Sequence, residues 1–480
     1  MINKSDIIKI NDYLWEIPKG YKDFMKVSAR FYADEVLLED ILKDRSLEQL
    51  INVSALNGIY KYALAMPDIH EGYASPIGGV AAIDSEIGII APGMQGYDIN
   101  CGMRLIKTNF EENEIKQFLK KLAREIYEAV PSGLGKGRKI KLSDEELNNI
   151  LDEGAKYLVK KGYGNENDLE FCESNGNLNY ADHRYISLTA KERGRDQIGT
   201  LGSGNHFLEI QKVNEIYDEK AAQVFGLFKN QIVIMIHTGS RGLGHQVATD
   251  YIKKFVNLMP KYKINVPDQE FACVPFQSQE GQEGFKASAA AANYAWANRQ
   301  MITYYIRKAI KKVFPSLKDD LDILYDVAHN IIKLETFQID GKEKKLLIHR
   351  KGATRAFPPF HPEIPFKYQE IGQPILIPGS MGTASYILKG LKEAEESFYS
   401  VCHGAGRTMS RHEAMRKMSS QTLKEELEKK GIIVMVNSVY NLAEEAPLAY
   451  KDVNRVVEVV SKAYLAQKVI QLVPLAVIKG

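Results

Sequence analysis

Residues 286–313, KASAAAANYAWANRQMITYYIRKAIKKV, are the longest stretch with helical periodicity in this 480-residue chain. Their many small side chains predict a helix that is buried around much of its circumference. Shorter helices are expected at residues 33–50, 113–129, 143–161 and 420–430, where apolar residues recur with a period of 3.6. A helix buried in this way belongs in the core of a large domain.

Short β-branched runs lie on both sides of this helix, namely VAAID, QIVIMIHT, KLLIH, PILIPG, IIVMVNS and PLAVI. Helices and strands do not alternate regularly along the chain, which favours an α+β fold over a doubly wound parallel sheet. The chain also lacks a Gly/Ser-rich or Pro-rich linker and a repeat of solenoid or propeller length. The sequence therefore gives no boundary at which to divide the chain into domains.

Composition and charge exclude several classes of protein. With 45% hydrophobic residues, the chain can form a large core without disulfides or a structural metal. Sixty-three Lys and Arg against 61 Asp and Glu exclude a histone-like or polybasic protein, although a basic cleft fits within this balance. The four cysteines form no CxxC pair, and the N-terminus resembles no signal peptide. We expect a soluble, cytoplasmic protein with no membrane partner.

Reactive side chains repeatedly follow or interrupt apolar strands and are flanked by glycine. Glycine beside such a side chain lets the backbone approach a ligand closely. Six segments share this pattern: MPDIHEGY (66–73), GYDINCGMR (96–104), LGSGNHFLE (201–209), IHTGSRGLGH (236–245), YDVAHNI (325–331) and VCHGAGRTMSR (401–411).

Five of these side chains form a candidate metal set: Asp98, Cys101, His206, His237 and His329. This mixture of oxygen, sulfur and nitrogen ligands suits Mn²⁺, Zn²⁺ or Co²⁺. If the thiolate bridges, the five ligands suit two neighbouring ions of the kind that clamp a phosphoryl group. A single histidine in such a position is more often a core or loop residue, and we interpret five others in that way: His183, His245, His349, His361 and His412.

His403 is a candidate nucleophile. It precedes Gly404 and Gly406 in a segment that predicts the start of a helix, on which Arg407 and Arg411 would share one face and bind an anion. Residues 377–385, 131–139 and 192–195 could also contact phosphates, although any one of these segments is more often a structural turn. The P-loop, KxDG, HExxH, HD and GxSxG motifs are all absent, which leaves metal-dependent phosphoryl or nucleotidyl transfer.

The segments GYDINCG, GSGNHFLE, IHTGSRGLGH, DVAHN, CHGAGR and PLAVIKG together resemble the RtcB family of 3′-phosphate/5′-hydroxyl RNA ligases. The resemblance extends from about residue 66 to the last glycine. It implies a tRNA-splicing or RNA-repair enzyme that uses GTP and two Mn²⁺ ions. A histidine takes GMP from GTP and passes it to an RNA 3′-phosphate, and the 5′-hydroxyl of a second RNA end then displaces GMP. A 2′,3′-cyclic phosphate end is first opened to the 3′-phosphate.

The resemblance also implies a role for particular residues. His403 would be the nucleophile and Asp68 would orient it. Asp98, Cys101 and His206 would hold one Mn²⁺, and Cys101, His237 and His329 the other. GMP would be surrounded by Asn205, His206, Phe207, Leu208, Glu209, His329, Asn330, Pro378, Gly379, Ser380, Met381, Ser385, His403, Gly404, Ala405, Gly406, Tyr450 and Lys479, with Glu209 selecting guanine. Arg193, Arg195, Arg407 and Arg411 would contact RNA phosphates.

We therefore predict one α+β domain over residues 1–480, with mixed or antiparallel sheets of the RtcB type around a deep metal-binding cleft. Residues 1–60 carry no functional motif. The expected substrates are RNA ends such as tRNA halves, an archease-type activator is a candidate partner, and a monomer is expected. Two alternatives remain. A metal-dependent phosphodiesterase or phosphatase acting on RNA ends would use the same Asp, Cys and His ligands but would not need His403. A non-ligating RNA-binding repair accessory is the second, and the intact His403 and Lys479 argue against it. Only the ligase requires GTP.

Overall fold

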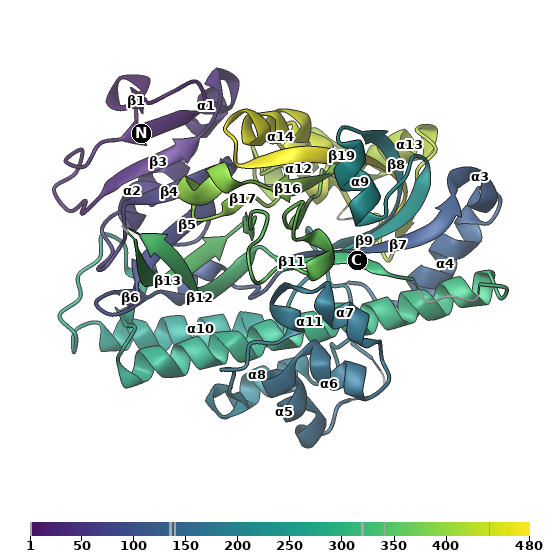
Figure 1. Cartoon of the computed structure of the whole chain (residues 1–480), viewed down its shortest axis with the longest axis horizontal. Helices are drawn as coiled ribbons and strands as arrows, with labels where there is room; N and C mark the ends of the chain where they lie inside the picture. The colour runs from purple at the N-terminus through teal and green to yellow at the C-terminus, as the bar shows by residue number, and fades with distance from the viewer. Residues whose placement is uncertain (1, 134–136, 139–140, 318–320, 340, 441) are drawn as a thin grey trace.

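The computed structural model describes residues 2–133, 137–138, 141–317, 321–339, 341–440 and 442–480. Part of the glycine loop at 131–139 therefore lies outside the described residues. The longest helix, α11 (Gln279–Val313), begins where the Ser278 hydroxyl accepts a hydrogen bond from the Gly281 amide, and most of its side chains are buried. In Figure 1, α11 runs beneath the sheets along the long axis, with α5, α6 and α8 on its other side. The prediction of a buried central helix is confirmed.

The remaining helices are shorter and lie around the sheets and along α11 (Figure 1). They are α1 (Glu35–Ile41), α2 (Ser46–Val53), α3 (Glu112–Ile115), α4 (Leu119–Ala129), α5 (Asp144–Glu153), α6 (Ala155–Lys160), α7 (Glu166–Glu170), α8 (Leu188–Gly194), α9 (Glu219–Phe225), α10 (Arg241–Leu258), α12 (Arg411–Lys417), α13 (Ser420–Lys429) and α14 (Val453–Lys462). Within the described residues, no helix is both long and apolar enough to cross a membrane.

Four of the helix predictions were wrong in detail. Residues 113–129 form α3 and α4, and residues 143–161 form α5 and α6, where one helix was expected in each case. Residues 33–50 form two helices instead of one, because the Asp44 carboxylate accepts hydrogen bonds from the Ser46 and Glu71 amides and so turns the chain between α1 and α2. The segment after His403 is not helical until Arg411. There Gly406 has a φ of 76°, and Arg407 instead forms a β-bridge with Tyr450.

An eight-stranded sheet contains most of the predicted strand-end residues. Its order is β11 (Ile323–Ala328), β7 (Gly102–Glu111), β9 (Gln231–Thr238), β8 (Phe207–Ile216), β19 (Ala466–Lys479), β16 (Ser385–Gly390) and β15 (Pro374–Ile377). These neighbours are antiparallel, and β18 (Ile433–Val436) is added parallel to β19. The sheet is therefore mixed, as the sequence predicts.

The register of this sheet places five strand ends at one edge. Gly102 of β7 is paired with both Ala328 of β11 and Thr238 of β9. One position away, Phe207 of β8 is paired with both His237 of β9 and Lys479 of β19. Residues separated by more than 370 positions in the sequence therefore meet at this edge.

A seven-stranded sheet lies beside the first. Its order is β1 (Ile8–Lys9), β2 (Leu14–Ile17), β3 (Ser28–Tyr32), β4 (Tyr62–His70), β5 (Ile77–Asp84), β13 (Lys342–Lys351) and β12 (Asn330–Ile339). Neighbours are antiparallel except β3 and β4. The N-terminal segment, which carries no functional motif, thus supplies β1–β3 to this sheet. Two small two-stranded sheets complete the fold, β6 (Ile89–Ile90) with β10 (Val274–Pro275) and β14 (Ala353–Arg355) with β17 (Ser400–Cys402).

The two large sheets meet at His329. β11 of the eight-stranded sheet ends at Ala328, and β12 of the seven-stranded sheet begins at Asn330. The His329 amide donates to the Cys101 carbonyl at 2.9 Å, and the Asn100 amide donates to the Asn330 carbonyl at 2.6 Å. The adjacent residues His329 and Asn330 therefore join both sheets to the loop that carries Cys101.

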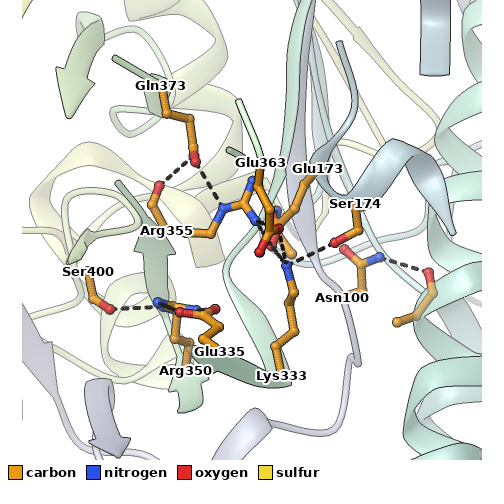
Figure 2. Close-up of polar contacts among 12 residues, drawn as sticks. Asn100, Glu173, Ser174, Lys333, Glu335, Arg350, Arg355, Glu363, Gln373 and Ser400 are labelled. Carbon is orange, nitrogen blue, oxygen red and sulfur yellow. Dashed lines mark hydrogen bonds and ion pairs between the residues drawn. The ribbon is translucent and has the colours of Figure 1, made fainter. Parts of the chain in front are cut away.

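A buried ionic network supports this junction from the side of β12 and β13 (Figure 2). Glu173, in a 3₁₀ turn at Glu173–Gly176, accepts a hydrogen bond from the Ala328 amide at 2.8 Å. Its carboxylate lies 3.3 Å from the ammonium of Lys333, which also approaches Glu363. Arg355 pairs with Glu363 at 2.6 Å. Opposite charges are paired throughout, as burial of charge requires.

Candidate active site

A cavity of about 1040 Å³ lies where the two sheets meet. Both sheets and the loops beside them line it. The predicted site residues that line it are Asp98, Cys101, Arg193, Asn205, His206, Phe207, Glu209, His237, His329, Asn330, Pro378, Gly379, Ser380, Met381, His403, Gly404, Ala405, Gly406, Arg407, Arg411, Tyr450 and Lys479. Four predicted residues are not among the lining residues, namely Asp68, Arg195, Leu208 and Ser385.

Two overlapping groups of ligand atoms lie in the cavity. One consists of Asp98, Cys101 and His206, and the other of Cys101, His237 and His329. Within each group the ligand atoms lie within 4.8 Å of one another. The Cys101 Sγ is 3.4 Å from the His206 Nε2 and 3.2 Å from the His237 Nε2. Cys101 therefore belongs to both groups, as a bridging ligand would.

The loops that carry these ligands pack closely on one another. Asp98 and Cys101 lie between a 3₁₀ turn (Pro92–Gln95) and β7. A Cβ atom on Gly239, two residues after His237, would collide with the Asp98 carboxylate. This is the close backbone approach that the glycine-flanked segments predict.

Backbone carbonyls orient two of the histidines. The His206 Nδ1 lies 3.1 Å from the Leu201 carbonyl, and the His237 Nδ1 lies 3.1 Å from the Asn205 carbonyl. A carbonyl only accepts hydrogen bonds, so each Nδ1 carries a proton, and each Nε2 faces Cys101. Carbonyl-oriented imidazoles of this kind are typical of metal ligands.

Burial controls the charge of the second group of ligands, Cys101, His237 and His329. It lowers the pKa of His237 and His329 well below the usual range, so both imidazoles are neutral. Burial, together with the nearby Asp98, raises the pKa of the Cys101 thiol well above its usual value. The Nδ1 atom of His329 is buried and has no hydrogen-bond partner among the described residues. Two neutral imidazoles, a carboxylate and a thiol that would release its proton on metal binding suit divalent cations.

His403 lies beside the second group of ligands. Its ring centroid is 5.0 Å from that of His329. The His403 Nδ1 is 2.6 Å from the Oδ2 of Asp68 on β4, and the backbone amide of His403 donates to the same oxygen at 3.1 Å. Asp68 is fully buried behind the histidine. Its contact with Nδ1 leaves the Nε2 of His403 available for chemistry.

A second part of the cavity is formed by Glu209, Lys479, Tyr450 and the loop 378–381. Burial raises the pKa of Glu209 to about 7, and the Gln211 amide donates to its Oε2 at 2.7 Å. The Ser385 hydroxyl accepts a hydrogen bond from the Gly379 amide and therefore supports this loop. Leu208, the residue before Glu209, is fully buried in an apolar cluster with Ile106 and Ile234, as strand alternation requires.

The four predicted arginines have different positions. Arg407 and Arg411 line the cavity, and both contact the buried carboxylate of Glu445, at 3.2 and 3.1 Å. Arg193 also lines the cavity. Arg195 instead pairs with Asp144 and Glu192.

Sequence reasoning missed several residues of the cavity wall. Glu445 follows no strand and has no glycine neighbour, so no local pattern indicated it. Arg241 and Lys351 also line the cavity, as does His245, for which the sequence favours a core or loop residue. The His245 ring stacks on Tyr97 with centroids 5.0 Å apart. For His349 the core interpretation is consistent with the structure, because this buried side chain accepts a hydrogen bond from the Ala91 amide.

Comparison with known proteins identifies the family. The family described as "tRNA-splicing ligase RtcB" matches residues 49–480. Proteins named tRNA-splicing ligase RtcB from Pyrobaculum aerophilum and Thermococcus kodakarensis are 52% and 51% identical to this chain, covering 99% and 98% of each chain. A third, from Methanococcus maripaludis, is 49% identical and covers 99% of this chain and 100% of the relative. The chain therefore belongs to the RtcB family of tRNA-splicing ligases.

Proposed function

We propose that this protein joins RNA 3′-phosphate or 2′,3′-cyclic phosphate ends to 5′-hydroxyl ends, using GTP and Mn²⁺. The observation that carries the proposal is the position of His403. Its Nδ1 is held by buried Asp68, and its ring lies 5.0 Å from His329 in one of the two ligand groups. A phosphodiesterase would need the ligand groups but would not need a nucleophile beside them.

In the first step, the Nε2 of His403 attacks the α-phosphorus of GTP and displaces pyrophosphate. Asp68 keeps the proton on Nδ1, so the Nε2 lone pair is available and the developing positive charge on the ring is balanced. The product is a guanylate joined to His403 through a P–N bond.

In the second step, an oxygen of the RNA 3′-phosphate attacks the same phosphorus, and the P–N bond breaks to restore His403. In the third step, the 5′-hydroxyl of the other RNA end attacks the RNA 3′-phosphorus, and GMP leaves. An end that carries a 2′,3′-cyclic phosphate must first be hydrolysed to a 3′-phosphate.

The two ligand groups would hold two Mn²⁺ ions, one on Asp98, Cys101 and His206 and the other on Cys101, His237 and His329. When bound, such ions would neutralise phosphate charge and orient the reacting phosphate groups. Asn205, Asn330 and the residues 404–406 would surround the nucleotide beside them.

Glu209 is the proposed guanine reader. It lies in the part of the cavity that contains Lys479, Tyr450 and the loop 378–381, and its carboxylate can accept hydrogen bonds from the Watson–Crick edge of guanine. Adenine presents an acceptor at one of these positions, so adenine would leave the buried carboxylate without a partner.

Arg193, Arg407 and Arg411 would bind RNA phosphates at the cavity, and tRNA halves are the proposed substrates. The four cysteines are all buried thiols, which suits a cytoplasmic protein. We expect a monomer that carries the complete site, with an archease-type protein as the candidate activator.

The test is to incubate the purified protein with Mn²⁺ and GTP labelled on the α-phosphate, and then to denature it and look for covalent label. Acid-labile label that is absent with ATP and absent in His403→Ala supports the proposal. Metal content measured in parallel should be unchanged in His403→Ala.

The alternatives give different outcomes. A protein that binds Mn²⁺ and hydrolyses RNA 3′-phosphate ends without ever acquiring label is a phosphoesterase. A protein that binds RNA but acquires no label and alters neither end, with or without an archease-type activator, is a non-ligating accessory.

A further inference from the structure

We propose that Arg299, in the middle of α11, is a positioning residue that fixes the Cys101–His237–His329 ligand group. The proposal rests on the function proposed above, in which these three residues hold a metal ion. Arg299 is fully buried and reaches the chain segments that carry all three ligands without itself being a ligand.

All five N–H donors of the Arg299 guanidinium have an acceptor. Two of them bond the Asp326 carboxylate, from Nε at 2.8 Å and from Nη2 at 2.8 Å. Two bond Asn100, reaching its carbonyl at 2.8 Å and its side-chain oxygen at 2.9 Å. The fifth bonds the Thr238 carbonyl at 2.9 Å. An arginine has no further donor, so this fork is completely used.

Each residue that accepts a hydrogen bond from Arg299 lies close in the sequence to one of the three ligands. Asn100 immediately precedes Cys101, Thr238 immediately follows His237, and Asp326 lies three residues before His329. The guanidinium therefore fixes the relative positions of three segments that belong to β11, β9 and the loop before β7. Because the fork is planar and rigid, a shift of one segment breaks bonds to the other two.

The loop that carries Cys101 is shaped to contact Arg299 and α11. Asn100 has a φ of 52°, in the left-handed region, and its side-chain amide donates to the Ala292 carbonyl of α11 at 2.8 Å. Figure 2 shows Asn100 directed at this helix. A Cβ atom on Gly102 would lie 3.2 Å from the Arg299 Cζ and 2.5 Å from the Val327 carbonyl oxygen. Residues on both sides of Cys101 thus accommodate the arginine.

The chain offers a matched control in Arg104. It is also fully buried and also pairs with Asp326, from its Nε at 2.7 Å. Its remaining hydrogen bonds to side chains reach Gln300 and Thr303 of α11 and the Sγ of Cys172. Loss of either arginine removes one buried charge and leaves Asp326 with the other, but of the two only Arg299 also bonds Asn100 and Thr238, the neighbours of Cys101 and His237.

The experiment is a Co²⁺ titration of the metal-free, full-length protein, because thiolate-to-cobalt charge-transfer absorption reports directly on Cys101. We expect Arg299→Met to bind Co²⁺ about 10- to 100-fold more weakly and with an altered band, as is typical when a residue that supports metal ligands is lost. Arg104→Met should keep the wild-type affinity and band despite a comparable loss of thermal stability.

Arg299→Lys provides a second variant should the methionine variant not fold. It keeps the charge beside Asp326 but cannot reproduce the fork, so its Co²⁺ affinity should also fall. Wild-type affinity and band in the folded Arg299 variants, or equal losses in the Arg104 and Arg299 variants, would overturn the positioning role. Absence of the thiolate band in the wild-type protein would instead reject the proposed metal site, and the positioning role with it.

Discussion

At the scale of single residues, the Asp68 carboxylate organises the proposed nucleophile. One oxygen, Oδ2, accepts hydrogen bonds from the His403 ring and from the backbone amides of His403 and Gly404. A Cβ atom on Gly406 would collide with the backbone of Asp68, so the turn after the histidine also packs on this residue. The sequence could indicate Asp68 only through a family resemblance, because it lies 335 residues away from His403.

Replacing Asp68 by Asn tests this arrangement. The amide keeps the shape but removes the charge that balances His403 as its ring becomes positive. Hydrogen bonds to charged groups contribute ~1.5–3 kcal/mol, so the rate of guanylation should fall by about 10- to 100-fold. The measurement is the single-turnover rate of labelling with α-labelled GTP. An unchanged rate would show that Asp68 does not assist the nucleophile.

Glu209 should make GTP binding depend on pH. Burial raises its pKa to about 7, so the carboxyl group is protonated below this pH and ionised above it. Only the ionised form can accept two hydrogen bonds from guanine. The apparent affinity for GTP should therefore fall as the pH is lowered through about 7, and this is measured as KM for guanylation between pH 5.5 and 8.5.

Glu209→Gln is the matched control for this titration. The amide has no charge to lose, so the variant should bind GTP weakly at every pH, and its KM should show no step near neutrality. It should also discriminate less between GTP and ATP. A step that persists in Glu209→Gln would assign the titration to another group.

At the scale of elements, the sequence predicted some of the strands and nothing of their alignment. The predicted runs VAAID, QIVIMIHT, KLLIH, PILIPG, IIVMVNS and PLAVI lie in β5, β9, β13, β15, β18 and β19, because an apolar β-branched run is a local pattern. No run was predicted for β7, which follows Cys101. The register that brings Gly102, Thr238 and Ala328 together depends on pairing between distant strands. The segment after His403 was predicted to begin a helix, with Arg407 and Arg411 on one face. Packing of Gly406 on Asp68 overrides that local pattern.

Arg411 and Arg195 should differ in their contribution to RNA binding. Arg411 begins α12 and lines the cavity, whereas Arg195 follows α8 and is held by Asp144 and Glu192. Arg411→Ala should weaken binding of single-stranded RNA and reduce the slope of log K against log salt by about 0.7. Arg195→Ala should leave both quantities unchanged. Fluorescence anisotropy with an unreactive RNA end measures them, and equal effects would contradict this distinction.

At the scale of the whole molecule, the single-domain α+β prediction agrees with the structure because the site residues extend across nearly the whole chain. Residues 1–60 are the exception, since they carry no motif and no role can be predicted for them from the sequence. The structure places β1–β3 at the end of the seven-stranded sheet, where β3 pairs with β4, the strand that carries Asp68. The contribution of residues 1–60 is structural, and the pairing of strands in a sheet cannot be predicted from sequence motifs.

Metal binding should stabilise the fold as a whole, because the ligands belong to segments from both large sheets. Adding Mn²⁺ to metal-free protein at about 100 times its Kd should stabilise it by about 2.7 kcal/mol, measured as a rise in Tm. Cys101→Ala should lose most of this rise, since both ligand groups use its thiol. Cys273→Ala removes an equally buried thiol from the apolar core and should retain it. A full response in Cys101→Ala would contradict the shared ligand.

The junction at His329 has a consequence for how the molecule opens. His329 is the single residue between β11 of one sheet and β12 of the other. Neither sheet can therefore fray at this edge without displacing a proposed ligand. Local opening of β11 and of β12 should then be a single event, and a bound ion should slow amide exchange in both strands to the same extent. Metal binding would therefore make the two neighbouring sheets unfold as one cooperative unit. Loss of the metal would reduce both the catalytic activity and the free energy of unfolding.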